Sequence, residues 1–265
     1  MSAEDKQAVK ITYAKPPLQE VVFGVQFPSI PDFTVGHIGK LWQKYDTEYP
    51  IFREQPAFVA TIERLPGESP FFNSPTLMPR CIFSTPDDAA VIQIQRDAFY
   101  YNWRKVAEEY PRYETVAARF DTEFKKFAEF IQSQNLSKLA PNQLELTYLN
   151  EIPVDVKVQH ILKDAAWIAD DHSFLPPPAF ISLTANFDMD SGVGSLHSDF
   201  RIIAKDDGAL VYQWILVARG CTNPRSDLTF DKMRPWYDKA RDWIVRGFTD
   251  LSTEEAQRVL WERES

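Results

Sequence analysis

Polar side chains at alternate positions in the centre of the chain are the strongest candidates for chemistry. Between residues 89 and 113, amide and guanidinium side chains alternate with apolar and aromatic ones on both sides of a short turn at Arg96–Ala98. A period of two places one set of side chains on one face of a β-hairpin. Arginine can bind a carboxylate or a phosphate, and amides read hydrogen-bond donors and acceptors. The candidate binding residues are Gln93, Gln95, Asn102 and Arg104, together with Tyr113 at the start of the following helix.

The same residues also allow two structural interpretations. The polar side chains can solvate an exposed sheet face while Phe99 and Trp103 pack inside. Alternatively, Asn102 and Arg104 can hold the segment Glu109–Tyr113 in a polar network. The patch contains no nucleophile, no base and no set of metal ligands, so we predict a binding surface there and no catalytic residue.

Serine, histidine and aspartate occur together on two predicted strands further along the chain. A hydrolase needs a nucleophile in fixed contact with a base, and donors for an oxyanion. Side chains spread along a flat strand do not form that arrangement, and no G-x-S-x-G motif is present. We therefore interpret these residues as a solvated sheet face. They are Ser182, Thr184, Asn186 and Asp188 on one strand, and Ser195, His197, Asp199 and Arg201 on the next.

Metal and nucleotide chemistry find little support in the sequence. The four histidines are isolated, and no H-x-x-x-H or H-E-x-x-H pattern is present. The chain has only 9 glycines, and it contains neither G-x-G-x-x-G nor a P-loop. We therefore predict no metal site and no cofactor.

The composition favours a globular protein and argues against broad nucleic-acid binding. The chain has 265 residues, a net charge of −9 and 44% hydrophobic residues. A chain of this length buries roughly 75% of its unfolded surface, as one domain or two closely packed halves. Its negative charge opposes contact with phosphate backbones, and no stretch is apolar enough to cross a membrane. Cys81 and Cys221 are expected to be buried free thiols, and with an N-terminus that lacks a signal they indicate a cytoplasmic protein.

The order of the expected elements divides the chain into two similar halves. Residues 1–15 are predicted to be a flexible lead, residues 16–140 an N-terminal half, and residues 141–265 a C-terminal half packed with the first as one unit. Each half reads as a strand, a helix, several antiparallel strands and a long helix, which suggests an internal duplication of order without clear sequence identity. We therefore predict an α+β fold whose helices cover one face of the sheet or sheets. The expected strands are 18–27, 57–64, 80–85, the hairpin around Arg96, 143–154, 179–188, 193–205 and 209–219; the expected helices are 35–49, 113–135, 156–166 and 229–249.

Three local signals refine the helices. Phe120, Phe124 and Phe127 recur at helical spacing and are predicted to lie on one buried face. Pro235 fits the last long helix only if it lies in the first turn. The segment Ser252–Glu255 has the Ser-x-x-Glu spacing of a capping box, so a short C-terminal helix is predicted to start there.

Several motifs occur in an order that resembles a known family. They are KPPLQEVVFGVQF, VIQIQRDAFYYNWRK, EYPRY, LTYLNEIPV and FTDLSTEEAQRVLW. Together they resemble a sporadically distributed prokaryotic family of uncharacterised proteins of similar length. Family members often carry a histidine near the start of the final long helix, where this chain reads YDKARDWIVRGF and has none. The resemblance implies a fold and a polar patch, and its patchy distribution is like that of accessory genes such as defence or toxin-linked modules.

These observations leave three functional hypotheses. The first is a non-enzymatic interaction or regulatory protein that binds a partner protein through the polar patch. The second is a small-molecule sensor in which a long helix grips a curved sheet around an aromatic pocket. The third is an unfamiliar enzyme. A deep aromatic cavity under the helix predicted at 113–135 favours the second hypothesis, and a solid core with a broad exposed face favours the first.

Overall fold

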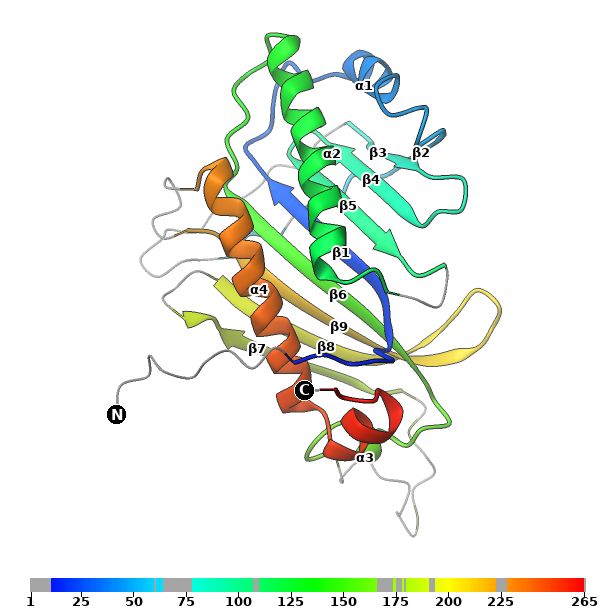
Figure 1. Cartoon of the computed structure of the whole chain (residues 1–265). Helices are drawn as coiled ribbons and strands as arrows, with labels where there is room; N and C mark the ends of the chain where they lie inside the picture. Colours follow the sequence, from blue (N-terminus) through cyan, green and yellow to red (C-terminus); the bar gives the residue numbers. More distant parts are fainter. Residues whose placement is uncertain are drawn as a thin grey trace.

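The molecule is built around one twisted antiparallel sheet (Figure 1). The computed structural model describes residues 11–59, 61–63, 78–106, 110–165, 174, 178, 180–190, 194–222 and 228–264. The strands are β1 Leu18–Gln26, β2 Ile51–Gln55, β3 Arg80–Ser84, β4 Ala90–Gln95, β5 Ala98–Arg104, β6 Gln143–Pro153, β7 Ser182–Asp188, β8 Gly194–Ala204 and β9 Leu210–Gly220. The helices are α1 Val35–Trp42, α2 Tyr113–Ser133, α3 Val158–Ile161 and α4 Phe230–Leu251, followed by the π-helical turn Ala256–Leu260. This mixture confirms the predicted α+β class.

The nine strands form a single sheet in the order β2-β3-β4-β5-β1-β6-β9-β8-β7. All neighbouring strands are antiparallel. The first strands of the two parts, β1 and β6, lie side by side in the middle, and the last strands, β5 and β9, flank them. The strand order is therefore similar on the two sides of the β1–β6 pair. Whether this order arose by internal duplication stays a prediction.

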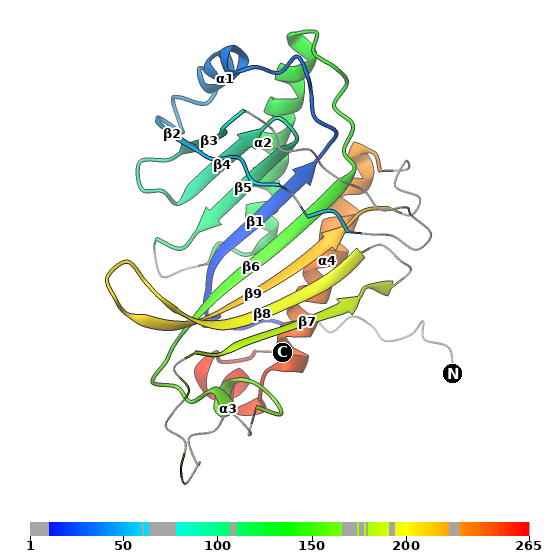
Figure 2. The ribbon, with the colours of Figure 1, turned by 180° about the vertical axis from the view of Figure 1, so that it is seen from behind.

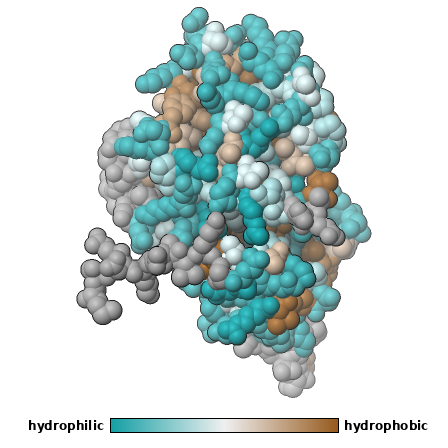
Figure 3. Space-filling view, in the orientation of Figure 1, coloured by the Kyte–Doolittle hydropathy of each residue, from teal (hydrophilic) through white to brown (hydrophobic). Residues whose placement is uncertain are grey.

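Both long helices lie across the same face of the sheet (Figures 1 and 2). The aromatic side chains between them form the centre of the core. Phe23 of β1 stacks on Phe120 of α2 and meets Tyr237 of α4, with ring centroids 5.0 Å apart in both pairs. Phe120, Phe124 and Phe127 are 1%, 4% and 0% exposed, which confirms the buried face predicted for this helix. On the outside, the helix-bearing side is mostly hydrophilic with small hydrophobic patches (Figure 3).

The opposite face of the sheet, called the far face below, carries rows of polar side chains that run across the strands. Gly24 pairs with Tyr100 on one side and with Glu145 on the other. A Cβ atom on Gly24 would lie 2.6 Å from the Tyr100 ring, so the ring can cross β1 only over a glycine. In the same row, Arg219 Nε donates to Glu145 Oε2 (2.7 Å).

Two expectations about the first half are wrong. The helix predicted over 35–49 ends at Trp42, because the next residues tighten into i→i+3 bonds such as Tyr45 N to the Trp42 carbonyl (2.7 Å). The strand predicted at 57–64 does not form in the described residues 57–59 and 61–63, and residues 60 and 64 lie outside them. Strand β2 is formed by residues 51–55 instead, and the segment after it leaves the sheet edge to cross the far face.

Three expectations about the chain ends and the last helices also need correction. Pro235 lies six residues into α4, past the first turn, and the helix continues through it. Thr253, and not Ser252, caps the C-terminal turn, because its Oγ1 accepts the N–H of Ala256 (3.0 Å) while Ser252 is buried at the end of α4. Helix α3 is limited to residues 158–161.

Candidate functional site

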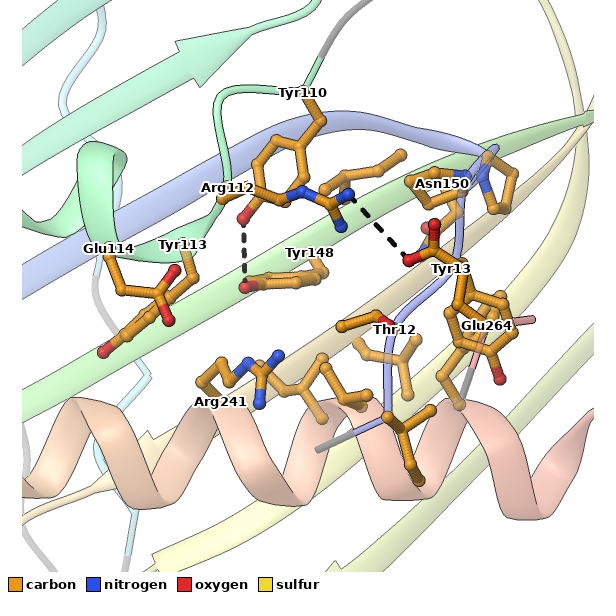
Figure 4. A pocket seen from close by; sticks show the side chains of 18 residues that line it. Thr12, Tyr13, Tyr110, Arg112, Tyr113, Glu114, Tyr148, Asn150, Arg241 and Glu264 are labelled. Carbon is orange, nitrogen blue, oxygen red and sulfur yellow. Dashed lines mark hydrogen bonds and ion pairs between the residues drawn. The ribbon is translucent and has the colours of Figure 1, made fainter. Parts of the chain in front are cut away.

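A cavity of about 230 Å³ lies between the two long helices and the ends of the chain (Figure 4). Its walls come from the segment before β1, the start of α2, strand β6 and the second half of α4. We call it the tyrosine pocket. Its apolar and aromatic lining includes Tyr13, Leu18, Tyr110, Tyr148, Ile244 and Phe248. Its polar lining includes Thr12, Arg112, Glu114, Asn150, Arg241 and Glu264.

The two ends of the described chain form the outer wall of this pocket. Residues 11–15 run antiparallel to residues 261–264, and we call this pair of segments the chain-end ribbon. Tyr13 faces Arg263 in it, and the backbone hydrogen bonds between the two segments are 2.9–3.1 Å long. The ribbon stops at the Pro16–Pro17 pair, because proline has no N–H to continue it. Residues 11–15 are therefore paired with the C-terminal segment, and residues 1–10 of the predicted flexible lead lie outside the described residues.

Tyrosine hydroxyls supply much of the polarity inside the pocket. The hydroxyls of Tyr110 and Tyr148 are 3.4 Å apart, and Tyr113 donates to Asp238 Oδ1 (2.7 Å). Burial raises the pKa of Tyr148 to about 12, although the hydrogen bond with Tyr110 and the charge of Arg241 act in the opposite direction. Burial also raises the pKa of Tyr110 and of Tyr113. All three hydroxyls are therefore neutral at pH 7, so each can donate a hydrogen bond and accept one.

Two arginines approach the pocket from opposite walls. Arg241 reaches into it from α4, and its positive charge acts to lower the pKa of the Tyr148 hydroxyl. Arg112, at the start of α2, lies 4.0 Å from a carboxylate oxygen of Glu264 in the chain-end ribbon. The backbone of Arg112 has φ 69° and ψ 155°, a region that is favourable almost only for glycine and costs about 1–3 kcal/mol. Such strain persists where the surrounding structure fixes it, and it clusters at ligand-binding sites.

The predicted binding residues lie elsewhere, on the far face. The strands β4 and β5 pair through a tight turn, as the sequence predicts. Gln93 Nε2 donates to Asn102 Oδ1 (2.9 Å), Asn102 Nδ2 donates to Glu20 Oε1 (2.6 Å), and Arg104 Nε donates to the same oxygen (2.9 Å). These residues therefore form a connected network with the carboxylate of Glu20 from β1, and no local pattern predicts that Glu20 lies beside them.

Tyr113 does not join this network. It lies on the helix-bearing side, where its ring stacks on Phe23 with centroids 5.8 Å apart. The prediction that all five candidates share one patch is therefore wrong for Tyr113, because Tyr113 begins α2, which covers the other face of the sheet. Trp103 lies on that side too and packs against Tyr110, with ring centroids 5.1 Å apart.

Gln95 has a different role from the other candidates. Its amide Nε2 donates to the Phe58 carbonyl (3.0 Å), and its Oε1 accepts the Phe58 N–H (3.4 Å). Three strands away, Gln143 binds the same crossing segment, donating to the Thr61 carbonyl (2.7 Å) and accepting the Glu63 N–H (2.7 Å). Both glutamines are fully buried. The two glutamine side chains take the place of the backbone hydrogen-bond partners that a neighbouring strand would supply. The segment is therefore held against the sheet without being one of its strands.

The far end of this crossing segment contacts His197, one of the residues weighed above as part of a hydrolase site. His197 Nε2 contacts a carboxylate oxygen of Glu63, and its Nδ1 lies 2.8 Å from Asn186 Oδ1. Glu63 also faces Arg219 at 3.5 Å. Both ring nitrogens of His197 are engaged with these partners, which supports the rejection of a Ser-His-Asp triad on this strand.

The tyrosine pocket was not predicted from the sequence, yet three of the motifs quoted above meet there. Pro16–Leu18, Tyr110–Tyr113 and Tyr148–Asn150 belong to three of those motifs, and residues from each line the cavity. Their separation along the chain hides this convergence, because only the β1–β6 pairing and the position of α2 bring them together.

Comparisons with known proteins add no functional information. No protein-family model matches the chain, and no curated protein is significantly similar to it. Within the described ranges, the histidine, cysteine, aspartate and glutamate side chains form no group of three that could hold a metal ion. In the same part of the chain, no helix combines the length and the apolar character needed to cross a membrane.

Proposed function

We propose that this chain is a non-catalytic binding protein whose tyrosine pocket takes a small molecule. The observation that carries the proposal is a cavity lined with aromatic side chains beside the start of α2, between α2 and α4. Binding sites of this kind are mostly apolar, with a few polar groups that fix the orientation of the ligand. The tyrosine pocket has this composition, since rings and aliphatic side chains surround two arginines and several hydroxyls.

The position of the pocket supports a sensor more than a passive carrier. A molecule in the cavity would touch α2, α4 and the chain-end ribbon at once. A ligand stabilises the state that it binds, by about 2.7 kcal/mol at a hundred times its dissociation constant. A bound ligand would therefore stabilise the contact of the chain-end ribbon, residues 11–15 and 261–264, with the two helices. A partner protein that binds at the surface could recognise this change.

A cavity-filling substitution tests this proposal. Val245 lines the pocket, so Val245→Trp should fill it and abolish binding. Val259→Trp adds the same side chain at a position that is 70% exposed and serves as the matched control. Small molecules extracted from protein purified from its native host are identified by mass spectrometry, and a fragment library is screened by protein-observed NMR.

We expect one class of molecule to bind the unmodified chain and the Val259→Trp variant but not Val245→Trp. The proposal fails if no molecule binds in either assay, or if binding is unchanged by Val245→Trp while the variant keeps the melting temperature of the control.

Partner binding at the far face is a second candidate function. One observation favours it: beyond the crossing segment, side chains of β6, β8 and β9 remain half exposed, next to the Gln93–Arg104 network. The edge strand β7 adds a row of largely exposed residues. Cross-linking of a captured partner should map to these strands, and links confined to the helix-bearing side would refute this candidate. A cytoplasmic location belongs to both candidates, and the two buried free thiols support it.

A further inference from the structure

We infer that the ligand of the tyrosine pocket is a small organic monoanion, a carboxylate on a ring-sized apolar body, whose anionic group binds Arg241. The inference rests on the proposed function, since it names the class of molecule for the same pocket. It stands on the surroundings of Arg241, on the hydroxyls beside it, and on the size and charge of the walls.

Among the described residues, no carboxylate forms an ion pair with Arg241. Arg241 extends from α4 into the pocket below Tyr148 (Figure 4). It is half buried, and it forms no ion pair with a carboxylate of the described residues. On the same helix, Arg234 and Arg246 each pair with an aspartate one turn away (3.1 and 3.0 Å). A guanidinium group can donate two parallel hydrogen bonds to one carboxylate, so a bound anion would supply the partner that Arg241 lacks among the described residues.

The hydroxyls beside Arg241 add donors for the same anion. Tyr110 and Tyr148 lie 3.4 Å apart, longer than the usual O–H···O distance of about 2.7–2.8 Å. A ligand oxygen near this pair can therefore accept a better hydrogen bond than the tyrosines make with each other. Because burial keeps both hydroxyls protonated at neutral pH, they act as donors and not as competing anions.

The walls of the pocket limit both the size and the charge of the ligand. A cavity of about 150 Å³ is enough for benzene, so the 230 Å³ of the tyrosine pocket fits one ring with a short polar arm. Leu18, Ile244 and Phe248 supply apolar surface for the ring. Glu114 and Glu264 also line the cavity, and a second negative charge on the ligand would be repelled by them.

Phenylacetate and its uncharged counterpart 2-phenylethanol test the inference on the whole chain. Both are titrated at pH 7 and followed by protein-observed NMR. We expect phenylacetate to bind about tenfold more tightly or better, because only the carboxylate makes charge-assisted hydrogen bonds with Arg241. Arg241→Met should remove this preference, Arg241→Lys should recover part of it, and Arg246→Met, on the same helix with a side chain that is 45% exposed, should leave it unchanged. Added salt should weaken the binding of the acid and not of the alcohol.

Each outcome separates this inference from the proposed function. If the alcohol binds as tightly as the acid, or if a folded Arg241→Met variant keeps the preference for the acid, the anionic class is wrong. Binding of either molecule that Val245→Trp abolishes still supports a small-molecule pocket. If neither phenylacetate nor 2-phenylethanol binds at millimolar concentration, the inference is wrong. The extraction of small molecules from the native host then tests the proposed function separately. Melting temperatures of the arginine variants establish that they fold, and Arg241→Lys provides the second variant should Arg241→Met unfold.

Discussion

Replacing Asn102 with alanine tests whether the polar network on the far face is structural. The Asn102 side chain is only 3% exposed, and it connects the amide of Gln93 to the carboxylate of Glu20. Arg104 binds the same carboxylate from the outside, with its side chain 40% exposed. The two substitutions Asn102→Ala and Arg104→Ala therefore remove a buried and an exposed member of one network.

The expected losses of stability differ because burial differs. Asn102→Ala removes one hydrogen bond between neutral groups, at about 0.5–1.5 kcal/mol, and one to a charged acceptor, at about 1.5–3 kcal/mol. Glu20 keeps its contact with Arg104, so the total should be roughly 2–3 kcal/mol. Arg104→Ala removes a half-exposed ion pair, which typically contributes about 0.2–1 kcal/mol. Glu20 then still accepts the hydrogen bond from Asn102 at 2.6 Å.

Urea unfolding of the two single variants and the double variant measures these values. We expect Asn102→Ala to cost at least about twice as much as Arg104→Ala, and the double variant to deviate from additivity because both residues share Glu20. A loss below about 0.5 kcal/mol for Asn102→Ala, the range of surface changes, would refute the structural network. Loss of partner binding by a fully stable Arg104→Ala variant would instead support recognition at this surface.

Three further predictions concern the core and the titrating groups. Phe124→Ala should reduce the free energy of unfolding by about 3–5 kcal/mol in a urea titration, because this ring is 4% exposed and contacts Phe99 at 5.4 Å between centroids. Cys81 is fully buried and burial raises its thiol pKa to about 11, so a thiol reagent at pH 8 should modify it only after unfolding; rapid reaction of the native chain would contradict its placement. Burial raises the pKa of Tyr148 to about 12, so its stabilising contribution is complete below pH 10 and is lost as the pH rises towards 12; stability measured from pH 8 to pH 11 should therefore fall less steeply for Tyr148→Phe.

The sequence predicted the elements whose signals are local. Alternation predicts the hairpin of β4 and β5, since only one register hides Ile92, Ile94 and Phe99 from water. Helical spacing identifies α2, because Phe120, Phe124 and Phe127 can share a buried face only in a helix. In both cases the burial of apolar side chains that repeat over a few residues determines the local structure, so the sequence pattern alone predicts it.

The candidate site was not predictable in the same way, because its determinants are distant in sequence. Segment 57–63 contains strand-like alternation, but Gln95 and Gln143 take its backbone hydrogen bonds from the far face. Tyr113 is predicted beside the patch by sequence distance alone, whereas its ring packs on Phe23 on the other side of the sheet. Arg241 carries no local signal, since only the packing of α4 on β6 shows that no carboxylate of the described residues pairs with it.

The tyrosine pocket lies where the two parts of the chain meet, so a ligand bound there would stabilise the contact between them. Tyr110 precedes α2 of the first part, while Tyr148 and Arg241 belong to β6 and α4 of the second. Neither part contains the site alone, so a ligand that bridges them would resist separation of the helices and of the β1–β6 pair beneath them. The chain-end ribbon closes the same pocket from outside, so a bound ligand would also stabilise the pairing of residues 11–15 with residues 261–264. A pocket in the centre of either part would stabilise that part only, whereas one at the junction connects occupancy to the arrangement of the whole molecule.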